Sequence, residues 1–173
     1  NMRRAQLKTI EPNLAHKIIE PIGRNTAPAI ALAALTVDKD AILFVTPSDH
    51  MTANAAKYKQ CIERAIELAN QNYIVTFGIK PTEPHTGYGY IEFDNEANKT
   101  PGSVNKVLQF REKPNIETAQ EFLDAGNYYW NAGIFLWRAD YFLQETQHHA
   151  PDLGQFIKNF PSNNPFPYIK TQF

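Results

Sequence analysis

Short, almost wholly apolar runs that alternate with helical segments restrict the fold of this sequence more than any other feature. Residues 41–47 read AILFVTP and residues 74–79 read IVTFGI, a pattern typical of strands buried on both faces. Between them, residues 53–70 place apolar side chains at helical spacing, and the alanine-rich run 29–35 has high helix propensity. This alternation predicts an α/β fold with a parallel sheet.

The second half of the chain predicts a different strand arrangement. Residues 88–93 and 104–110 read as consecutive strands, which indicates an antiparallel excursion from the sheet. The other expected elements are a strand at 17–21, a helix at 116–125 capped by Gly126, a strand at 130–137 and a helix at 140–149. We expect one partial domain, with a lead-in at 1–16, a core at 17–160 and an irregular tail at 161–173.

The overall composition excludes several classes of protein. A net charge of -1 provides no basic field that would hold nucleic acid or an anionic membrane surface. No apolar run approaches the roughly 20 residues that span a bilayer. Cys61 is the only cysteine, so an intrachain disulfide is excluded, and we expect a reducing, cytoplasmic location.

In an open α/β sheet, ligands bind at the carboxyl ends of the strands, and this rule selects the candidate sites. The first lies at 20–26, where a strand leads into a glycine turn and a helix with Asn25 or Thr26 at its N-cap. Free N–H groups at such a helix start favour an anion or the polar edge of a base, and Arg24 adds a positive charge. The alternative is an ordinary strand-to-helix turn.

Asp49 follows a predicted buried strand and is the second candidate. A single carboxylate suits Mg²⁺, which takes one or two protein carboxylates and binds substrate phosphates and water with its other positions. The alternative is an N-cap for the next helix. His50 beside it reads as a packing or orienting residue.

Three further segments carry polar or glycine residues at strand ends. Gly87 and Gly89 allow a ligand to approach the backbone closely, or they form a bulge or tight turn. Glu112 and Lys113 suit the hydroxyls and the phosphate of a sugar phosphate, or they form a solvated charged turn. Asn131 is either a structural bridge or a sugar contact, because a buried amide must find hydrogen-bond partners.

Taken in order along the chain, six segments carry a specific resemblance. They are EPIGRNTAPAIA at 20–31, TPSDH at 46–50, FGIKPT at 77–82, TGYGYI at 86–91, FREKP at 110–114 and WNAGIF at 130–135. Together they resemble the bacterial mannose-1-phosphate guanylyltransferases over about residues 17 to 155. That family transfers a guanylyl group from GTP to mannose 1-phosphate, giving GDP-mannose and pyrophosphate.

The resemblance implies a Rossmann-like, GT-A-like mixed sheet flanked by helices, with GTP, mannose 1-phosphate and Mg²⁺ as ligands. It implies Asp49 as the metal ligand and Asp49 and Lys113 as the catalytic residues. The implied nucleotide-binding residues are Gly23, Arg24, Asn25 and Thr26, and the implied sugar-phosphate residues are Gly87, Glu112, Lys113, Asn131 and Gly133. We expect Asp49, Glu112 and Lys113 to converge on a single cleft.

The sequence departs from the family by lacking the glycine-rich signature GGxGTRLxPxS. We therefore expect an internal segment, truncated at the N-terminal strand, with little or no turnover alone. We also expect a homo-oligomer that forms through an exposed sheet edge. The alternatives are a glucose-1-phosphate nucleotidyltransferase and a non-catalytic nucleotide-sugar-binding remnant.

Overall fold

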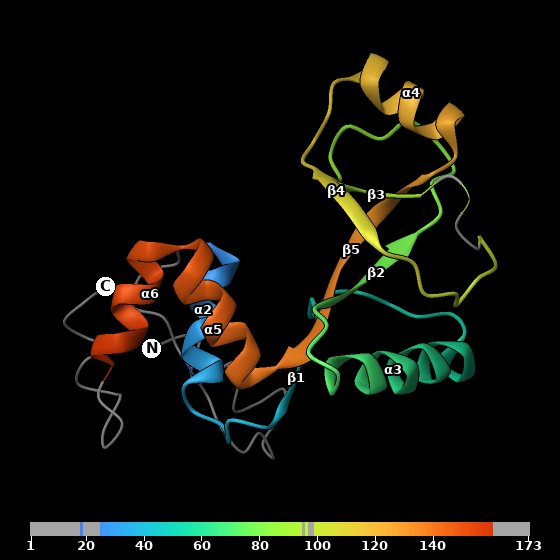
Figure 1. The fold of residues 1–173 in the computed structure, drawn as a ribbon. Coiled ribbons are helices and arrows are strands. Elements are labelled where there is room, and N and C mark those ends of the chain that lie inside the picture. Colours follow the sequence, from blue (N-terminus) through green and yellow to red (C-terminus); the bar gives the residue numbers. More distant parts are fainter. Residues whose placement is uncertain (1–17, 19–24, 95, 97–98, 161–173) are drawn as a thin grey trace.

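The computed structural model describes residues 18, 25–94, 96 and 99–160. The predicted strand at 17–21, the lead-in and the tail lie outside these ranges, apart from Ile18. The described elements, shown in Figure 1, are α2 (Thr26–Ala34), β1 (Ile42–Val45), α3 (Ala55–Ala69), β2 (Val75–Ile79), β3 (Tyr90–Phe93), β4 (Val107–Arg111), α4 (Ile116–Ala125), β5 (Tyr128–Arg138), α5 (Ala139–His149) and α6 (Pro151–Asn159).

The eleven-residue strand β5 holds the sheet together. Phe135 pairs with Val45 of β1 and with Thr76 of β2, so β1 and β2 lie on opposite edges of β5. Trp130 pairs with Ile79 of β2 and with Tyr90 of β3 in the same way. Strands β1 and β3 therefore share one edge of β5, and β4 continues the sheet beyond β3.

The α/β class with a sheet flanked by helices is confirmed, but the expected parallel pairing is wrong for the described strands. Each of their pairings is antiparallel. Strands β1 and β2 do run in the same direction, as the helix between them requires, but β5 from much later in the chain lies between them. The alternation of strands and helices along the sequence predicts that two successive strands run in the same direction. It does not predict whether another strand lies between them in the sheet.

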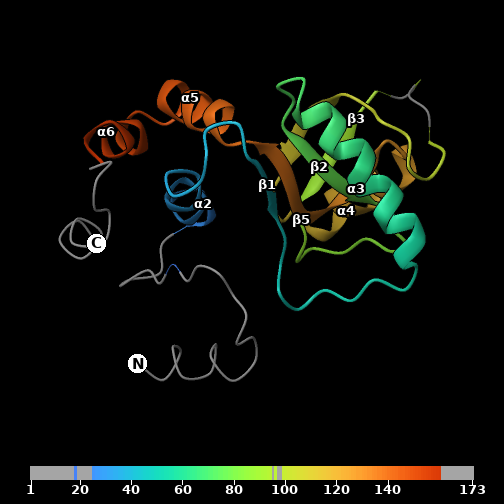
Figure 2. The same ribbon diagram turned by 90° about the horizontal axis from the view of Figure 1, so that it is seen from below.

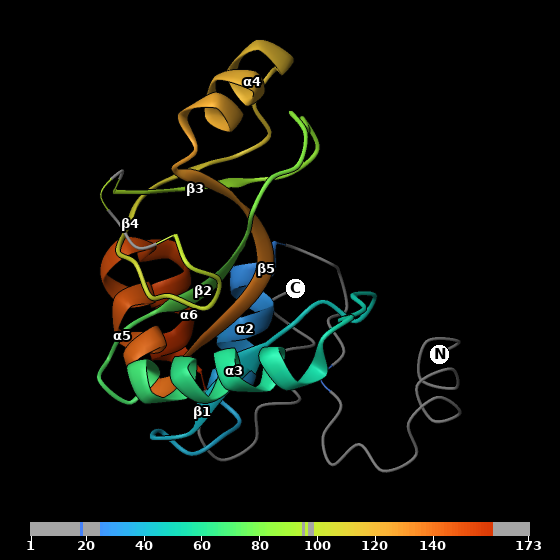
Figure 3. The ribbon, with the colours of Figure 1, turned by 90° about the vertical axis from the view of Figure 1, so that its right-hand side faces the viewer.

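Three apolar clusters follow one another along β5. Near its C-terminal end, Trp137 packs with residues of α2, α5 and α6 on one face. Leu136 points to the opposite face and packs against Ala65 and Ala69 of α3. Near its N-terminal end, Tyr128 and Trp130 border a cluster of Tyr90 with Ala119 and Phe122 of α4. Figure 2 shows α2, α5 and α6 grouped together beside the sheet, and Figure 3 shows α4 at the far end of the sheet.

Local sequence signals explain most element boundaries. Asn25, Asn54 and Asn115 cap α2, α3 and α4 through their side chains. Gly126 ends α4 with φ of 70°, as predicted. Helix α6 was not predicted, although Pro151 at its start is a residue that favours the first helical turn.

Strand β1 differs from the expectation of burial on both faces. Phe44 is 42% exposed, and β1 pairs only with β5 among the described strands. None of the helices in the described ranges has the length and apolar character needed to span a bilayer.

Candidate functional site

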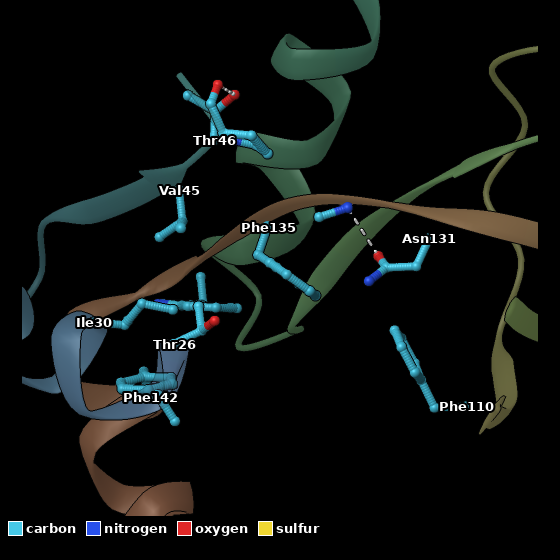
Figure 4. Close-up of a pocket in the computed structure, with 12 residues that line it drawn as sticks. Thr26, Ile30, Val45, Thr46, Phe110, Asn131, Phe135 and Phe142 are labelled. Atoms are coloured by element: carbon cyan, nitrogen blue, oxygen red, sulfur yellow. Dashed lines mark hydrogen bonds between the residues drawn. The ribbon is translucent and has the colours of Figure 1, made fainter. Parts of the chain in front are cut away.

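A gap in the sheet creates the main candidate site. On the edge of β5 that β1 and β3 share, β1 pairing ends at Phe135 and β3 pairing begins at Trp130. The edge between them is bordered by the carboxyl end of β1, which is where ligands of open α/β sheets bind. A pocket of about 580 Å³ opens there, between the start of α2, the end of β1 and the middle of β5 (Figure 4).

The lining of this pocket is mostly apolar with a few polar groups. Its residues are Thr26, Ala27, Ile30, Val45, Thr46, Pro47, Phe110, Asn131, Gly133, Phe135, Trp137 and Phe142. An apolar wall with a small number of oriented polar groups is the usual character of a small-molecule site. Of the residues expected from the sequence, the pocket brings together Thr26, Asn131 and Gly133.

The Asn131 amide is held in one orientation. Its Oδ1 accepts the Gly133 N–H at 3.1 Å, and the Thr76 hydroxyl lies 3.2 Å from the same oxygen. Because a backbone N–H can only donate, the bonded atom must be the amide oxygen, which leaves Nδ2 as the free donor. Nδ2 faces the interior of the pocket in Figure 4 and has no partner among the described residues. The pocket therefore presents one fixed hydrogen-bond donor.

Gly133 allows this arrangement. Its φ is 67°, a conformation that residues other than glycine adopt at a cost. A Cβ atom at this position would lie 3.4 Å from Pro47 Cγ, so the glycine also permits the close approach of the segment after β1. Glycine at position 133 therefore permits both the left-handed backbone of β5 and the close contact with Pro47.

The N-terminus of α2 forms another wall of the pocket. Asn25 is the N-cap, and its Oδ1 accepts the Thr26 N–H at 2.8 Å. Thr26 lines the pocket, whereas Asn25 is exposed and does not. Gly23 and Arg24 lie outside the described residues.

Glu112 lies on the same face of the sheet as Asn131, with Gly89 between them. The Asn131 N–H donates to the Gly89 carbonyl at 2.8 Å, and a Cβ atom on Gly89 would lie 3.0 Å from Glu112 Oε2. Glu112 lines a second pocket of about 570 Å³ between β4 and α4. Its other carboxylate oxygen, Oε1, lies 3.5 Å from Lys113 Nζ, in an ion pair whose side chains are both largely exposed.

Gly87 belongs to a turn that precedes β3 and lines neither pocket. Its N–H donates to His85 Nδ1 at 3.0 Å. The His85 ring stacks on Tyr88 with centroids 3.9 Å apart, and Tyr88 meets Trp130 edge-on. The turn is thus packed against the N-terminal end of β5.

Asp49 lies beyond the end of β1, close in sequence to Thr46 and Pro47 of the pocket. Its side chain is exposed and has no hydrogen bond or ion pair within the described residues. The described residues contain no group of three or more His, Cys, Asp and Glu side chains that would hold a metal ion.

The predicted convergence of Asp49, Glu112 and Lys113 on one cleft is not confirmed. Neither of the two pockets is lined by Asp49 or Lys113, and Glu112 lines only the second. Phe110 lines both pockets and was not predicted as a site residue. Phe110 stands at the start of the FREKP segment, so its position in that motif was the available signal.

The fold and the strand-end pocket define a class of protein that the sequence comparisons identify. Residues 3–167 match the profile of the nucleotidyl transferases, and the chain belongs to that family. It is 43% identical over 152 residues to a mannose-1-phosphate guanylyltransferase of Sinorhizobium fredii, covering 86% of this chain and 29% of the relative. It is 42% identical over 154 residues to the Escherichia coli mannose-1-phosphate guanylyltransferase, covering 86% of this chain and 32% of the relative.

Solved structures show the same fold. A crystal structure described as mannose-6-phosphate isomerase from Helicobacter pylori is 38% identical, with a TM-score of 0.74 over 88% of this chain and 58% of that one. One described as mannose-1-phosphate geranyltransferase from Thermus thermophilus is 26% identical, with a TM-score of 0.81 over 96% of this chain and 49% of that one. The chain spans about three tenths of the length of the curated relatives cited above.

Proposed function

We propose that this chain forms part of the substrate-binding site of a mannose-1-phosphate guanylyltransferase, which converts GTP and mannose 1-phosphate to GDP-mannose and pyrophosphate. The observation that carries the proposal is the pocket in the gap on β5, where the α2 N-terminus and the fixed Asn131 donor meet beside the end of β1. These residues belong to the segments that resemble the guanylyltransferases. The names and identity of the curated relatives support the same reaction.

In this proposal the two sides of the pocket bind different ligands. Thr26, with Gly23, Arg24 and Asn25, contacts the nucleotide, since free N–H groups at a helix start favour anions. Asn131 and Gly133 contact the sugar through the amide donor and the adjacent backbone. Glu112 accepts hydrogen bonds from sugar hydroxyls across the open Cα of Gly89, and Gly87 borders the sugar phosphate.

Lys113 and Asp49 supply the charges. Among the described residues, Lys113 Nζ is held only by an exposed ion pair with Glu112, so it can turn toward a phosphate at little cost. The Asp49 carboxylate is exposed and unpaired among the described residues, which fits a cation that needs one or two carboxylates. Mg²⁺ bound there would neutralise phosphate charge.

The reaction needs positioning more than covalent chemistry. A phosphate oxygen of mannose 1-phosphate attacks the α-phosphorus of GTP in line, and pyrophosphate leaves from the opposite side. The contribution of the chain is to hold the acceptor sugar in the pocket and to place cationic groups near the charge that develops. Each ligand contact above acts on binding or orientation, and none requires a covalent intermediate.

Ligand binding tests the proposal directly. A ligand present at about 100 times its Kd raises the free energy of unfolding by about 2.7 kcal/mol, so thermal unfolding detects it. Mannose 1-phosphate should stabilise the chain more than glucose 1-phosphate does, and GTP with Mg²⁺ should stabilise it independently. Glu112→Gln should raise the Kd for mannose 1-phosphate about tenfold or more, because a charged hydrogen-bond acceptor is lost.

Glu117→Gln is the matched control, since Glu117 is an exposed carboxylate in the first turn of α4 that lines neither pocket. Equal losses in both variants would contradict a sugar contact at Glu112. A preference for glucose 1-phosphate would favour the glucose branch, and the absence of any saturable shift would favour a remnant without ligands. We expect little or no pyrophosphate release from this chain alone, and an ordinary enzymatic rate would contradict that expectation.

The proposal extends to assembly and location. We propose a single partial nucleotidyltransferase domain that works in the cytoplasm. Strand β1 has one edge without a described strand partner and carries the exposed Phe44, and unpaired edges favour association. We expect a homo-oligomer that pairs through this edge. Light scattering at high concentration should detect it, and a clean monomer would contradict it.

A further inference from the structure

The Tyr90 hydroxyl makes two hydrogen bonds to the backbone of a single residue in the preceding turn. Tyr90 is 0% exposed, and its ring packs against Phe122 and Ala119 of α4. The hydroxyl accepts the His85 N–H at 3.0 Å and donates to the His85 carbonyl oxygen at 2.9 Å. One side-chain oxygen thus satisfies both backbone polar groups of His85.

These bonds set the conformation of the whole turn from His85 to Tyr88. Once the His85 backbone is held, its imidazole stacks on Tyr88, and its Nδ1 accepts the Gly87 N–H. The turn contains no helix or strand, so few other hydrogen bonds hold it.

The same residue is connected to the candidate sugar site on the other face of the sheet. Tyr90 follows Gly89, whose carbonyl accepts the Asn131 N–H and whose open Cα faces Glu112. Tyr90 also pairs with Trp130, the neighbour of Asn131 in β5. A shift of the turn would therefore move Gly87 and the Gly89 backbone relative to Asn131 and Glu112.

We propose that Tyr90 is a positioning residue for the sugar-phosphate ligand, acting through its hydroxyl on the turn His85–Tyr88. This inference rests on the function proposed above for the site. A phenylalanine ring would fill the same buried space, so packing alone does not require a hydroxyl group at position 90. The two hydrogen bonds to His85 do require it, because without them the N–H and the carbonyl of His85 lose their partner.

Tyr128 provides a matched control within the same aromatic cluster. Its ring stacks on Phe122 with centroids 4.1 Å apart, as the Tyr90 ring also contacts Phe122. Tyr128 pairs with Glu92 of β3, and burial together with the nearby Glu92 carboxylate raises the pKa of the Tyr128 hydroxyl, which makes no hydrogen bond to the turn within the described residues. Tyr128→Phe and Tyr90→Phe thus remove the same atom from the same cluster but from different partners.

Hydrogen exchange of the whole chain tests the positioning step without any ligand. In Tyr90→Phe, the amides of His85 and Gly87 should exchange about tenfold faster or more, while those of α5 and of residues 135–138 at the C-terminal end of β5 keep their rates. Tyr128→Phe should leave the turn amides unchanged. Unchanged exchange in Tyr90→Phe, or equal acceleration in both variants, would overturn the proposal.

If Tyr90→Phe does not fold, His85→Ala serves instead. That variant removes the ring and the Gly87 acceptor but leaves both bonds from Tyr90 to the backbone. The amide at position 85 should stay protected while the Gly87 amide is released. Loss of protection at both positions would contradict the proposal that the Tyr90 hydroxyl holds the turn.

Ligand affinity tests the second step. Tyr90→Phe should raise the Kd for mannose 1-phosphate about tenfold and change the Kd for GTP less than about twofold. A purely structural role would lower the unfolding temperature and leave both Kd values alike, which overturns the link to the ligand. If the unmodified chain binds no sugar phosphate, the proposed function and the ligand link both fail, and the exchange result still decides whether Tyr90 holds the turn.

Discussion

The two ends of β5 are held in different ways. At the C-terminal end, Trp137 is 4% exposed, stacks on Phe142 and joins a cluster drawn from α2, α5 and α6. At the N-terminal end, a smaller buried cluster of Tyr90, Ala119 and Phe122 lies on one face, and the buried Phe93 packs edge-on against Tyr129. Polar contacts of Tyr90 and Asn131 add to this packing. Every residue of the neighbouring strand β4 is exposed.

This difference separates stability from ligand contact. Apolar burial is the dominant favourable term in folding, so the C-terminal end should carry most of the free energy of unfolding. Regions with few buried apolar contacts open at lower free energy, and ligand-binding loops are drawn from such regions. The pocket lies between the two ends and takes Phe142 and Trp137 from one side and Phe110 and Asn131 from the other. We therefore expect the C-terminal end of β5 to be the more stable side of the pocket and the N-terminal end to open at lower free energy.

The two tryptophans of β5 provide the largest test. Trp137→Ala should lower the free energy of unfolding by about 3–5 kcal/mol, because a buried aromatic ring is replaced by a cavity. Trp130 is only partly buried, so Trp130→Ala should cost less. Urea unfolding followed by far-UV circular dichroism measures both losses. If Trp130→Ala costs as much as Trp137→Ala, the contrast between the two ends is wrong.

Alanine substitutions at two glycines test the same difference in packing between the two ends of β5, because each adds one methyl group. A Cβ atom on Gly154 of α6 would lie 2.8 Å from the Gln147 Cα of α5, so Gly154→Ala must push the helices apart. Overpacking of this kind costs about 1–3 kcal/mol. In Gly89→Ala the one tight contact of the new Cβ is with the exposed Glu112 carboxylate, which can turn away, and Phe110 Cε1 and the Arg111 carbonyl oxygen lie at ordinary contact distances of 3.5 and 3.6 Å. The stability loss should therefore stay below about 0.5 kcal/mol.

Thermal unfolding of the two variants measures these stability losses, and the affinity of each variant for mannose 1-phosphate provides a second comparison between them. Gly89→Ala should weaken the sugar phosphate although it hardly changes stability, because the displaced carboxylate is a proposed ligand contact. Gly154→Ala should lower the stability and leave the affinity for the sugar phosphate almost unchanged. A large stability loss in Gly89→Ala would show that the N-terminal end is packed more tightly than its burial indicates.

Gly133 lies where the two ends meet, and its replacement should have an intermediate effect. Its φ of 67° costs a residue with a side chain about 1–2 kcal/mol, and the new methyl group would lie against Pro47. Gly133→Ala should therefore lower both stability and ligand affinity. Gly126 is the control, since it has a similar φ of 70° at the end of α4 and lines neither pocket. Gly126→Ala should lower stability without changing affinity.

Local patterns in the sequence were enough to predict most elements of the fold. The helix at 116–125 and its Gly126 cap agree with the structure residue by residue, because capping and periodicity are local properties. The neighbours of β1 were not predictable in this way. Its partner β5 lies about 90 residues later in the chain, and no local signal specifies which strand enters between β1 and β2.

The candidate site shows the same limit. Thr26, Asn131 and Gly133 were predicted from motifs and meet in one pocket. The gap on β5 that brings them together depends on where β1 pairing stops and β3 pairing starts, which is a property of the register. Tyr90 was also overlooked, because a tyrosine within an alternating strand reads as ordinary core until the hydroxyl contacts are known.

The smallest predicted effect concerns a polar contact at the rigid end. Arg138 at the end of β5 donates two hydrogen bonds to Asp140 of α5, at 2.6 and 2.9 Å. These bonds hold the pKa of Asp140 below its ordinary value. A carboxyl group with a lowered pKa contributes stability above its unfolded pKa of about 3.9 and loses that contribution as the pH falls through the folded value.

Asp140→Asn should therefore lower the urea midpoint slightly at pH 7, and the difference from the unmodified chain should vanish as the pH falls below about 4. Asp38→Asn is the control, because the Asp38 side chain is exposed and has no partner among the described residues. We expect only a small effect at Asp140 because the pair is partly exposed to solvent, which screens it. A loss as large as that of Trp137→Ala would mean that an ion pair, and not apolar packing, holds the C-terminal end of β5.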